Sequence, residues 1–165
     1  VLLTVGSHGP AYYLRYDPAT APFAPTCQTG ELGKCSSEEI VNTYDNTIAF
    51  TDRILAETVD MLAGATNVVP VMYYVSDHGE SLGENGLYLH AAPWFMAPSE
   101  QTHVPMVTWV SPEAETRLGV TKACLDARKG EKLSQDNMFA TILGMLDIQT
   151  EARDPALDLT ADCRG

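Results

Sequence analysis

Side chains that commonly bind metal ions follow two short apolar runs of this sequence. They are His8 after residues 1–5, and Asp77, His78, Glu80 and His90 after residues 68–75. A carboxylate oxygen and a neutral imidazole nitrogen are both good ligands of Zn²⁺, at about 2.0–2.2 Å. Three of the four histidines belong to this set. The pattern predicts a metal site to which both segments contribute.

Asp77 and His78 are sequence neighbours, which limits how they can act together. Adjacent side chains of a regular strand point to opposite faces, whereas in a turn just past the strand both can converge on one ion. Gly79 allows the backbone to bend there, and Glu80 returns a third side chain of ligand type. An Asp-His pair alone is more often a turn cap beside a histidine bonded to backbone. The further candidate ligands favour the metal site instead.

Phosphoryl transfer is the chemistry that such a site suits. A phosphoryl group in transfer carries charge on its non-bridging oxygens, which bound metal ions can offset while activating the attacking oxygen. The sequence has 22 acidic residues against 10 basic ones, a net charge of −12, and no basic run that could neutralise an anion instead. The same charge argues against nucleic acid as a partner.

Other residues near the candidate ligands carry weaker predictions. Ser7 and Ser76 adjoin the histidine segments, but no partner base is evident, so neither is predicted as a nucleophile. Arg15 either helps to hold a phosphate beside His8 or, more commonly, forms a surface ion pair. His103 leads into an apolar run, which favours a structural role. Five loop aromatics either line a lipid-facing approach or cover the core: Tyr12, Tyr13, Tyr16, Trp94 and Phe95.

Alternating strands and helices are predicted to position these side chains. The predicted elements are a buried strand at 1–5, a helix at 37–63, strands at 68–75 and 106–110, and a helix at 135–147. This order is typical of an α/β fold with a mainly parallel sheet flanked by helices. Ligands of such sheets collect beyond the carboxyl ends of the strands, where the candidate ligands lie.

The boundaries of both helices follow from capping residues and apolar spacing. Ser36 and Glu39 have the form of a capping box before the first helix, Gly64 is expected to end it, and Ser134 can cap the second. The apolar face of the first helix is predicted to be Val41, Tyr44, Ile48, Thr51, Leu55, Thr58 and Leu62. The inward face of the second is predicted to be Met138, Phe139, Ile142, Leu143 and Leu146.

The four cysteines indicate an oxidising compartment. Cys27 and Cys35 bracket a short loop without a CxxC motif, which favours a structural disulfide over a redox or zinc site. Such a bridge stabilises by about 2–3 kcal/mol on the chain-entropy model. Cys124 and Cys163 either form a second bridge that ties down the C-terminal tail or remain unpaired. Periplasm or cell exterior is therefore favoured.

The beginning of the sequence indicates part of a longer protein. An interior strand at residues 1–5 would need neighbouring strands already in place. No run approaches the roughly 20 apolar residues that span a bilayer, and the start lacks the pattern of a signal peptide.

The candidate ligand segment resembles a signature of one bacterial enzyme family. Residues 74–90, YVSDHGESLGENGLYLH, are similar to the signature of phosphoethanolamine transferases, which modify lipid A or other envelope glycans. These enzymes belong to the alkaline phosphatase and sulfatase superfamily. Further similar segments are 6–13, 41–47, 101–105 and 163–164. The resemblance implies that residues 1–165 are the C-terminal portion of a sulfatase-like periplasmic catalytic domain.

The resemblance also implies roles for the matched residues. Asp77 and His78 would bind a tightly held zinc ion that activates the nucleophile. His8 and His90 would bind the phosphate or a second zinc ion, with Glu80 nearby. In the family, a glutamate and a nucleophilic threonine complete the first zinc site, and both lie upstream of the matched region. Cys27–Cys35 would match one of the family's disulfides.

The implied reaction moves phosphoethanolamine from phosphatidylethanolamine to the catalytic threonine and then to a lipid A phosphate. Its place is the periplasmic face of the inner membrane, reached through an N-terminal membrane domain that this chain lacks. The reaction lowers the negative charge of the envelope and is linked to polymyxin and colistin resistance. A monomer is expected, and the isolated 165 residues are expected to be inactive.

Two other functions remain open from the sequence. Another superfamily member, such as a sulfatase, phosphatase or phosphoglycerol transferase, would differ in its nucleophile. A cysteine that becomes formylglycine marks a sulfatase, whereas threonine fits transfer. A metal-binding module without catalysis is the other alternative.

Overall fold

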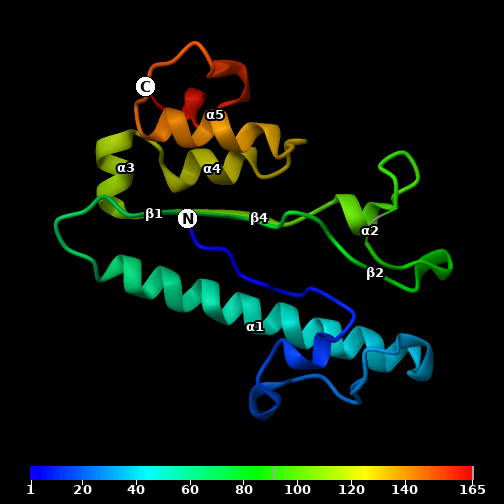
Figure 1. Ribbon diagram of the computed structural model, residues 1–165. Coiled ribbons are helices and arrows are strands. Elements are labelled where there is room, and N and C mark those ends of the chain that lie inside the picture. The colour runs from blue at the N-terminus through cyan, green and yellow to red at the C-terminus, as the bar shows by residue number, and fades with distance from the viewer. Residues whose placement is uncertain (91, 165) are drawn as a thin grey trace. The chain divides into compact units, whose positions relative to one another are not determined.

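The computed structural model of the protein describes residues 1–90 and 92–164, which divide into two compact units. The first unit combines Val1–Thr58 with Ser76–Pro105, and the second combines Val59–Val75 with Met106–Gly165. Helices and short strands occur in both units (Figure 1). The α/β class expected from the sequence is therefore confirmed.

Residues 1–5, predicted as a buried strand, form no strand in the first unit. Leu2 and Leu3 are 88% and 96% exposed. A strand needs a neighbour to bond its backbone N–H and C=O groups, and none of the residues described here pairs with this segment. The prediction was wrong because apolar character alone does not supply a pairing partner.

The following loop is irregular, as predicted, and a disulfide closes part of it. It contains the 3-10 helices η1 (Tyr12–Leu14), η2 (Pro18–Thr20) and η3 (Leu32–Lys34). The predicted bond between Cys27 and Cys35 is present, with Cα atoms 5.7 Å apart. The buried core of this region consists of Tyr12, Cys27, Leu32 and Ile40. The loop therefore folds around its own small core against the next helix.

Helix α1 spans Ser37–Ala63 and confirms the predicted range. The Ser36 N–H donates to Glu39 Oε2 at 2.7 Å, and the Glu39 N–H donates to Ser36 Oγ at 3.2 Å, which completes the capping box.

The predicted apolar face of α1 is wrong in part. Val41 and Ile48 are exposed, whereas Thr43 and Asn46 are among the buried residues. Thr43 Oγ1 accepts from the Cys27 N–H at 2.7 Å, and the Asn46 amide bonds to both the N–H and the C=O of Phe23. Polar side chains occupy this face because the packed loop presents backbone groups that must be satisfied.

The rest of the first unit is a small hairpin with a short helix. Strands β2 (Ser81–Leu82) and β3 (Tyr88–Leu89) pair antiparallel around η4 (Glu84–Gly86). Helix α2 spans Ser99–Thr102. This hairpin carries Glu80 and His90 at its two ends.

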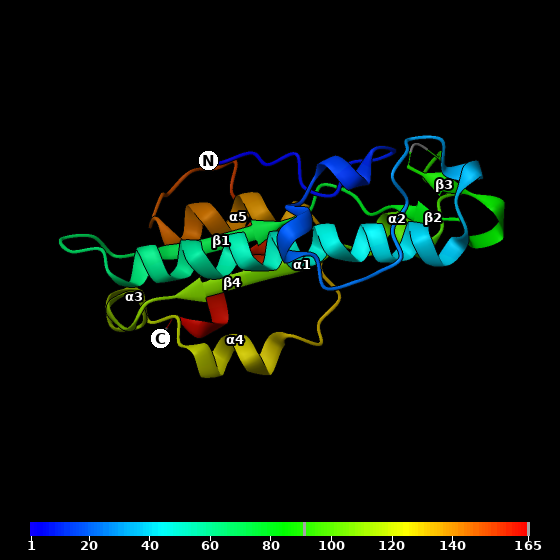
Figure 2. The same ribbon diagram turned by 90° about the horizontal axis from the view of Figure 1, so that it is seen from below.

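The second unit is built on strands β1 (Val71–Val75) and β4 (Met106–Val110), which lie side by side in Figure 2. Both predicted strands are confirmed, but they pair antiparallel, with Val71 opposite Val110. The sequence predicted a mainly parallel sheet. Parallel neighbours need a crossover, usually an α-helix, and α2, with four residues, is the one α-helix in the described residues between β1 and β4.

Two short helices of the second unit were not predicted from the sequence. Helix α3 (Pro112–Leu118) is capped by Ser111, and α4 (Lys122–Arg128) is capped by Thr121. Each has only seven residues, too few for a visible apolar period. The bond between Cys124 and Cys163 is present, so the C-terminal tail is tied to α4. No helix of the described ranges is long and apolar enough to cross a membrane.

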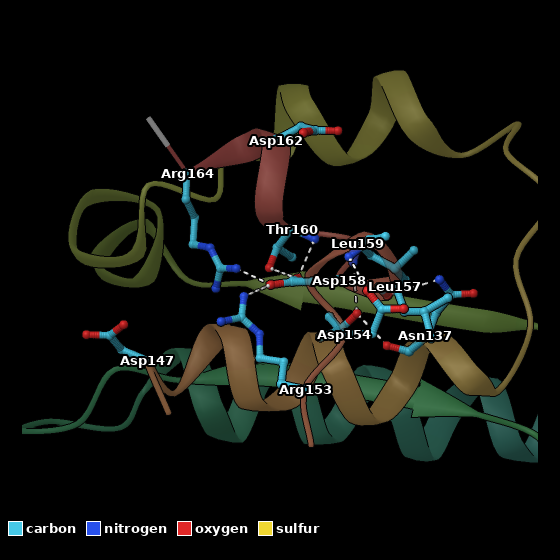
Figure 3. A network of polar contacts seen from close by, with 12 residues as sticks. Asn137, Asp147, Arg153, Asp154, Leu157, Asp158, Leu159, Thr160, Asp162 and Arg164 are labelled. Carbon is cyan, nitrogen blue, oxygen red and sulfur yellow. Dashed lines mark hydrogen bonds and ion pairs between the residues drawn. The ribbon is translucent and has the colours of Figure 1, made fainter. Parts of the chain in front are cut away.

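Helix α5 (Asp136–Met145) confirms the second predicted helix but neither its cap nor its inward face, because the N-cap residue is Gln135 and not Ser134. Phe139 and Leu146 are 55% and 64% exposed, whereas Thr141 and Gly144 are buried. The C-terminal tail includes η5 (Pro155–Leu157) and η6 (Ala161–Cys163), and its polar groups cover the face of α5 that carries Thr141 and Gly144 (Figure 3). The Leu159 N–H, for example, donates to Thr141 Oγ1 at 3.0 Å.

Asp158 is the centre of this polar contact (Figure 3). Its side chain is fully buried, and Oδ2 accepts from Arg153 at 2.6 Å and also from Arg164. Burial alone raises the pKa of Asp158, but hydrogen bonds from Thr160 and Arg153 and the charge of Arg164 outweigh it. The pKa therefore lies below its ordinary value. A Cβ at Gly144 would lie 2.0 Å from Asp158 Oδ2, so the helix must have glycine there.

Candidate metal centre

The first unit brings together most of the predicted ligands. His78, Glu80 and His90 offer ligand atoms that all lie within 4.8 Å of one another. The ring centroids of His78 and His90 are 3.9 Å apart. The ring of His8 meets that of His90 edge-on, with centroids 5.2 Å apart. The three histidines and Glu80 therefore form one cluster, although they come from segments far apart in the sequence.

The turn after β1 is shaped by a close backbone contact at Gly79. Its N–H donates to the Gln101 carbonyl oxygen at 3.0 Å, and a Cβ at this position would lie 2.0 Å from the Glu100 carbonyl oxygen. The Gln101 side chain also donates to Ser81 Oγ at 2.8 Å. Helix α2 therefore fixes the segment that carries His78 and Glu80.

Each of the three clustered histidines uses the same ring nitrogen for an internal hydrogen bond. Nδ1 lies 2.7 Å from the Gly9 carbonyl oxygen in His8 and 2.9 Å from the Gly79 carbonyl oxygen in His78. In His90 it contacts Glu80 Oε1. Carbonyl and carboxylate oxygens only accept, so Nδ1 must donate in every case.

In a neutral imidazole whose Nδ1 donates a hydrogen bond, Nε2 carries the lone pair and can bind a metal ion. Histidines that bind metal ions almost always donate their other ring N–H to a carbonyl or carboxylate oxygen. The donor chemistry of His8, His78 and His90 therefore fits a zinc or phosphate site.

Asp77 stands at the margin of the cluster. Its side chain is 87% exposed, and its Oδ2 lies 3.9 Å from His78 Nε2. Two ligand atoms of one zinc ion can be separated by at most about 4.4 Å, because each lies about 2.0–2.2 Å from the metal. Asp77 and His78 can therefore share one ion. The group whose ligand atoms all lie close to one another, however, consists of His78, Glu80 and His90.

Tyr12 belongs to the site, although the sequence indicated only lipid contact or core packing for it. Its hydroxyl donates to Glu80 Oε2 at 2.5 Å, and both side chains are buried. Burial raises the pKa of Tyr12 far above its ordinary value, and the bond to Glu80 raises it further. The phenol therefore keeps its proton. Its proximity to His8 in sequence was the available signal.

The remaining candidates make contacts of other kinds. Ser7 Oγ accepts from Thr47 Oγ1 at 2.6 Å, and Ser76 Oγ donates to the His78 carbonyl oxygen at 2.8 Å. Arg15 Nε donates to the His8 carbonyl oxygen at 3.2 Å and forms no ion pair within the described ranges. It therefore supports the backbone of His8.

The loop aromatics differ in exposure. Tyr12 and Tyr16 are buried, as expected of residues that cover the core, and Tyr13 is half-buried. Trp94 and Phe95 are 80% and 85% exposed. His103 is also exposed, and its N–H closes α2 by donating to the Ser99 carbonyl oxygen at 2.7 Å. This backbone bond does not involve the imidazole ring, so the structural role of the His103 side chain stays a prediction.

Comparison with known proteins places the whole cluster within one family. The family model described as Sulfatase matches residues 1–148, which include all four clustered residues. The chain belongs to the sulfatase family. This sulfatase-family chain is 46% identical over 166 residues to phosphoethanolamine transferase EptA of Salmonella typhimurium. It is 40% identical over 165 residues to phosphatidylethanolamine transferase Mcr-1 of Escherichia coli. Both alignments cover 99% of the chain.

A solved structure supports the same relationship. The soluble domain of lipooligosaccharide phosphoethanolamine transferase A from Neisseria meningitidis superposes with a TM-score of 0.94 at 44% identity, over 98% of this sulfatase-family chain. The chain spans 30% of the Salmonella relative, 28% of Mcr-1 and 49% of the solved soluble domain. The sulfatase-like fold expected from the resemblance is thereby confirmed.

Proposed function

We propose that residues 1–165 are the C-terminal portion of the periplasmic catalytic domain of a zinc-dependent phosphoethanolamine transferase. The enzyme transfers phosphoethanolamine from phosphatidylethanolamine to a lipid A phosphate. The observation that carries this proposal is the cluster of three histidines with Nδ1 engaged and Nε2 available. The names of relatives at 40–46% identity supply the transferred group.

Different residues of this chain bind the metal and the phosphate. Asp77 and His78 hold one tight zinc ion, and His8 and His90 hold the phosphate or a second ion. Zinc, when bound, offsets the charge of the phosphate oxygens and activates the attacking oxygen. Glu80 orients His90 through the contact with Nδ1.

The nucleophile belongs to the longer protein. We assign it to a threonine that accepts the phosphoryl group covalently before transfer to lipid A. A glutamate from the same region completes the zinc ligands with Asp77 and His78. In this arrangement, Asp77, His78, His8 and His90 supply one part of the site, and the longer protein supplies the rest.

Exposed apolar side chains after His90 support a lipid as the donor. Trp94, Phe95 and Met96 are 80%, 85% and 66% exposed. Aromatic residues are enriched where proteins meet the membrane interface. We place the enzyme at the periplasmic face of the inner membrane as a monomer, and its product lowers envelope charge and confers polymyxin resistance.

Lipid A from cells that express the full-length protein tests this function. Mass spectrometry is expected to show added phosphoethanolamine, and cells with the His90→Ala variant are expected to yield unmodified lipid A. Unmodified lipid A from cells with stable, zinc-loaded wild-type protein would contradict the proposal.

A further inference from the structure

We propose that Tyr12 is a positioning residue of this site: its hydroxyl holds the Glu80 carboxylate, and Glu80 fixes the ring of His90 with Nε2 available. The consequence for catalysis rests on the proposed function. The consequence for zinc affinity rests on the zinc site of that proposal, whereas the consequence for the histidine ring rests on the contacts of Glu80 alone.

The two oxygens of Glu80 have separate partners. Oε2 accepts from the Tyr12 hydroxyl at 2.5 Å, and Oε1 contacts His90 Nδ1. Only 4% of the Glu80 side chain is exposed, so water has little access to either oxygen. Removing one donor would leave a buried carboxylate oxygen unpaired, which is costly and favours a different orientation of the side chain. The position of His90 therefore depends on Tyr12.

Tyr12 is held rigidly enough to act in this way. Its ring is buried with Cys27, Leu32 and Ile40, and it meets the ring of Tyr44 edge-on at 5.5 Å. A Cβ at Gly9 would lie 2.7 Å from the Tyr12 hydroxyl, so the chain passes directly over it. The disulfide-closed loop and α1 thus fix the point from which Glu80 is held.

Packing alone does not require the hydroxyl. Phenylalanine would fill nearly the same volume among the same apolar neighbours. The hydroxyl instead has a charged acceptor, and a hydrogen bond to a charged group contributes more than one between neutral groups. A tyrosine at this position is therefore explained by its contact with Glu80.

The Tyr12→Phe variant of the full-length protein tests the inference. With His90 as a ligand of the second zinc ion, the affinity for that ion, measured by competition with a chelator, and kcat with a phosphatidylethanolamine donor are each expected to fall about 10–100-fold, as when a residue that orients a ligand is lost. KM for the lipid is expected to stay unchanged. Tyr16→Phe is the matched control, because Tyr16 is also buried in this loop and its hydroxyl has no hydrogen bond among the described residues. Wild-type affinity for this second ion in Tyr12→Phe would overturn the proposal.

A double-mutant cycle shows whether Tyr12 acts through Glu80. Tyr12→Phe is expected to reduce zinc affinity much less in a Glu80→Gln background than in the wild type, because the two residues form one unit. Fully additive losses would contradict the proposal.

A spectroscopic measurement needs no variant and so does not depend on how Tyr12→Phe folds. The ¹⁵N spectrum of histidine-labelled, metal-free wild-type protein is expected to show His90 protonated at Nδ1, and protonation at Nε2 alone would overturn the inference. Should the protein show these effects yet transfer no phosphoethanolamine, only the proposed function would fail.

Discussion

The histidine rings of the candidate metal centre are oriented by hydrogen-bond acceptors close to them. Two of these acceptors are backbone carbonyl oxygens of the residues that follow His8 and His78, and the third is Glu80. A ring held through Nδ1 needs little rearrangement to bind through Nε2. The residue types of the site were predictable from the sequence, but the nitrogen that each ring presents was not, because it depends on contacts made only after folding.

His78 is the residue whose loss should affect metal and activity together. In the full-length protein, His78→Ala is expected to remove bound zinc. It should lower transfer by more than the roughly 10–100-fold typical of residues that only orient a ligand. Metal analysis and turnover measure both effects. His103→Ala is the control, because His103 is exposed and lies outside the cluster. Full zinc content in His78→Ala would show that His78 is structural.

At the scale of elements, the segment after β3 connects the metal centre to the exposed Trp94 and Phe95. Replacing both by serine is expected to raise KM for a donor embedded in vesicles by about tenfold or more, since burying one large apolar side chain contributes about 1.5–3 kcal/mol. Turnover of a water-soluble donor analogue should not change. Phe139→Ser, at an exposed aromatic of α5, is the control. An equal loss with both donors would place these aromatics in the catalytic step.

The contact between α5 and the C-terminal tail should depend on pH through Asp158. Because the folded pKa is below the unfolded value of about 3.9, the stabilisation is complete above that value and is lost as pH falls through the folded pKa. At pH 7, Asp158→Asn is expected to lower the free energy of opening of α5 by about 3–5 kcal/mol, as when a buried ion pair loses one partner.

Hydrogen exchange of the α5 amides measures this free energy at each pH. The difference between wild type and Asp158→Asn is expected to shrink as the pH falls below 4, where the wild-type carboxyl becomes protonated. A difference that is constant down to pH 2 would contradict the assigned role of the charge. Asp162→Asn is a suitable control, because the Asp162 side chain is 86% exposed.

Elements with strong local signals were predictable, and their faces were not. Helix α1 and strand β4 have the predicted ranges because capping residues and an apolar run define them locally. The faces of α1 and α5 were assigned by apolar spacing. Thr43 and Thr141 are buried instead, since backbone N–H groups of distant segments bond to their hydroxyls. Such long-range contacts leave no periodic pattern in the sequence.

At the scale of the whole molecule, the chain spans only part of the relatives that it matches. Residues 1–5 expose apolar side chains without a neighbouring strand among the described residues, and the chain spans 30% of its Salmonella relative. Apolar runs indicate strands, but strand pairing and direction depend on tertiary contacts that leave no local signal in the sequence. The predictions of a strand at 1–5 and of a mainly parallel sheet were therefore wrong.

The isolated 165 residues are expected to lack transfer activity, because the proposed threonine and glutamate belong to the longer protein. The measurement is turnover of a phosphatidylethanolamine analogue by the purified chain with zinc present, beside the full-length protein as the positive control. Measurable turnover by the chain alone would show that it contains its own nucleophile.

The position of the metal tests the account most directly. Anomalous diffraction at the zinc edge, from crystals of the full-length protein, is predicted to show a peak about 2.0–2.2 Å from His78 Nε2 and from a carboxylate oxygen of Asp77. Zinc bound through Nδ1 of these histidines, or zinc located only away from His8, His78 and His90, would contradict it.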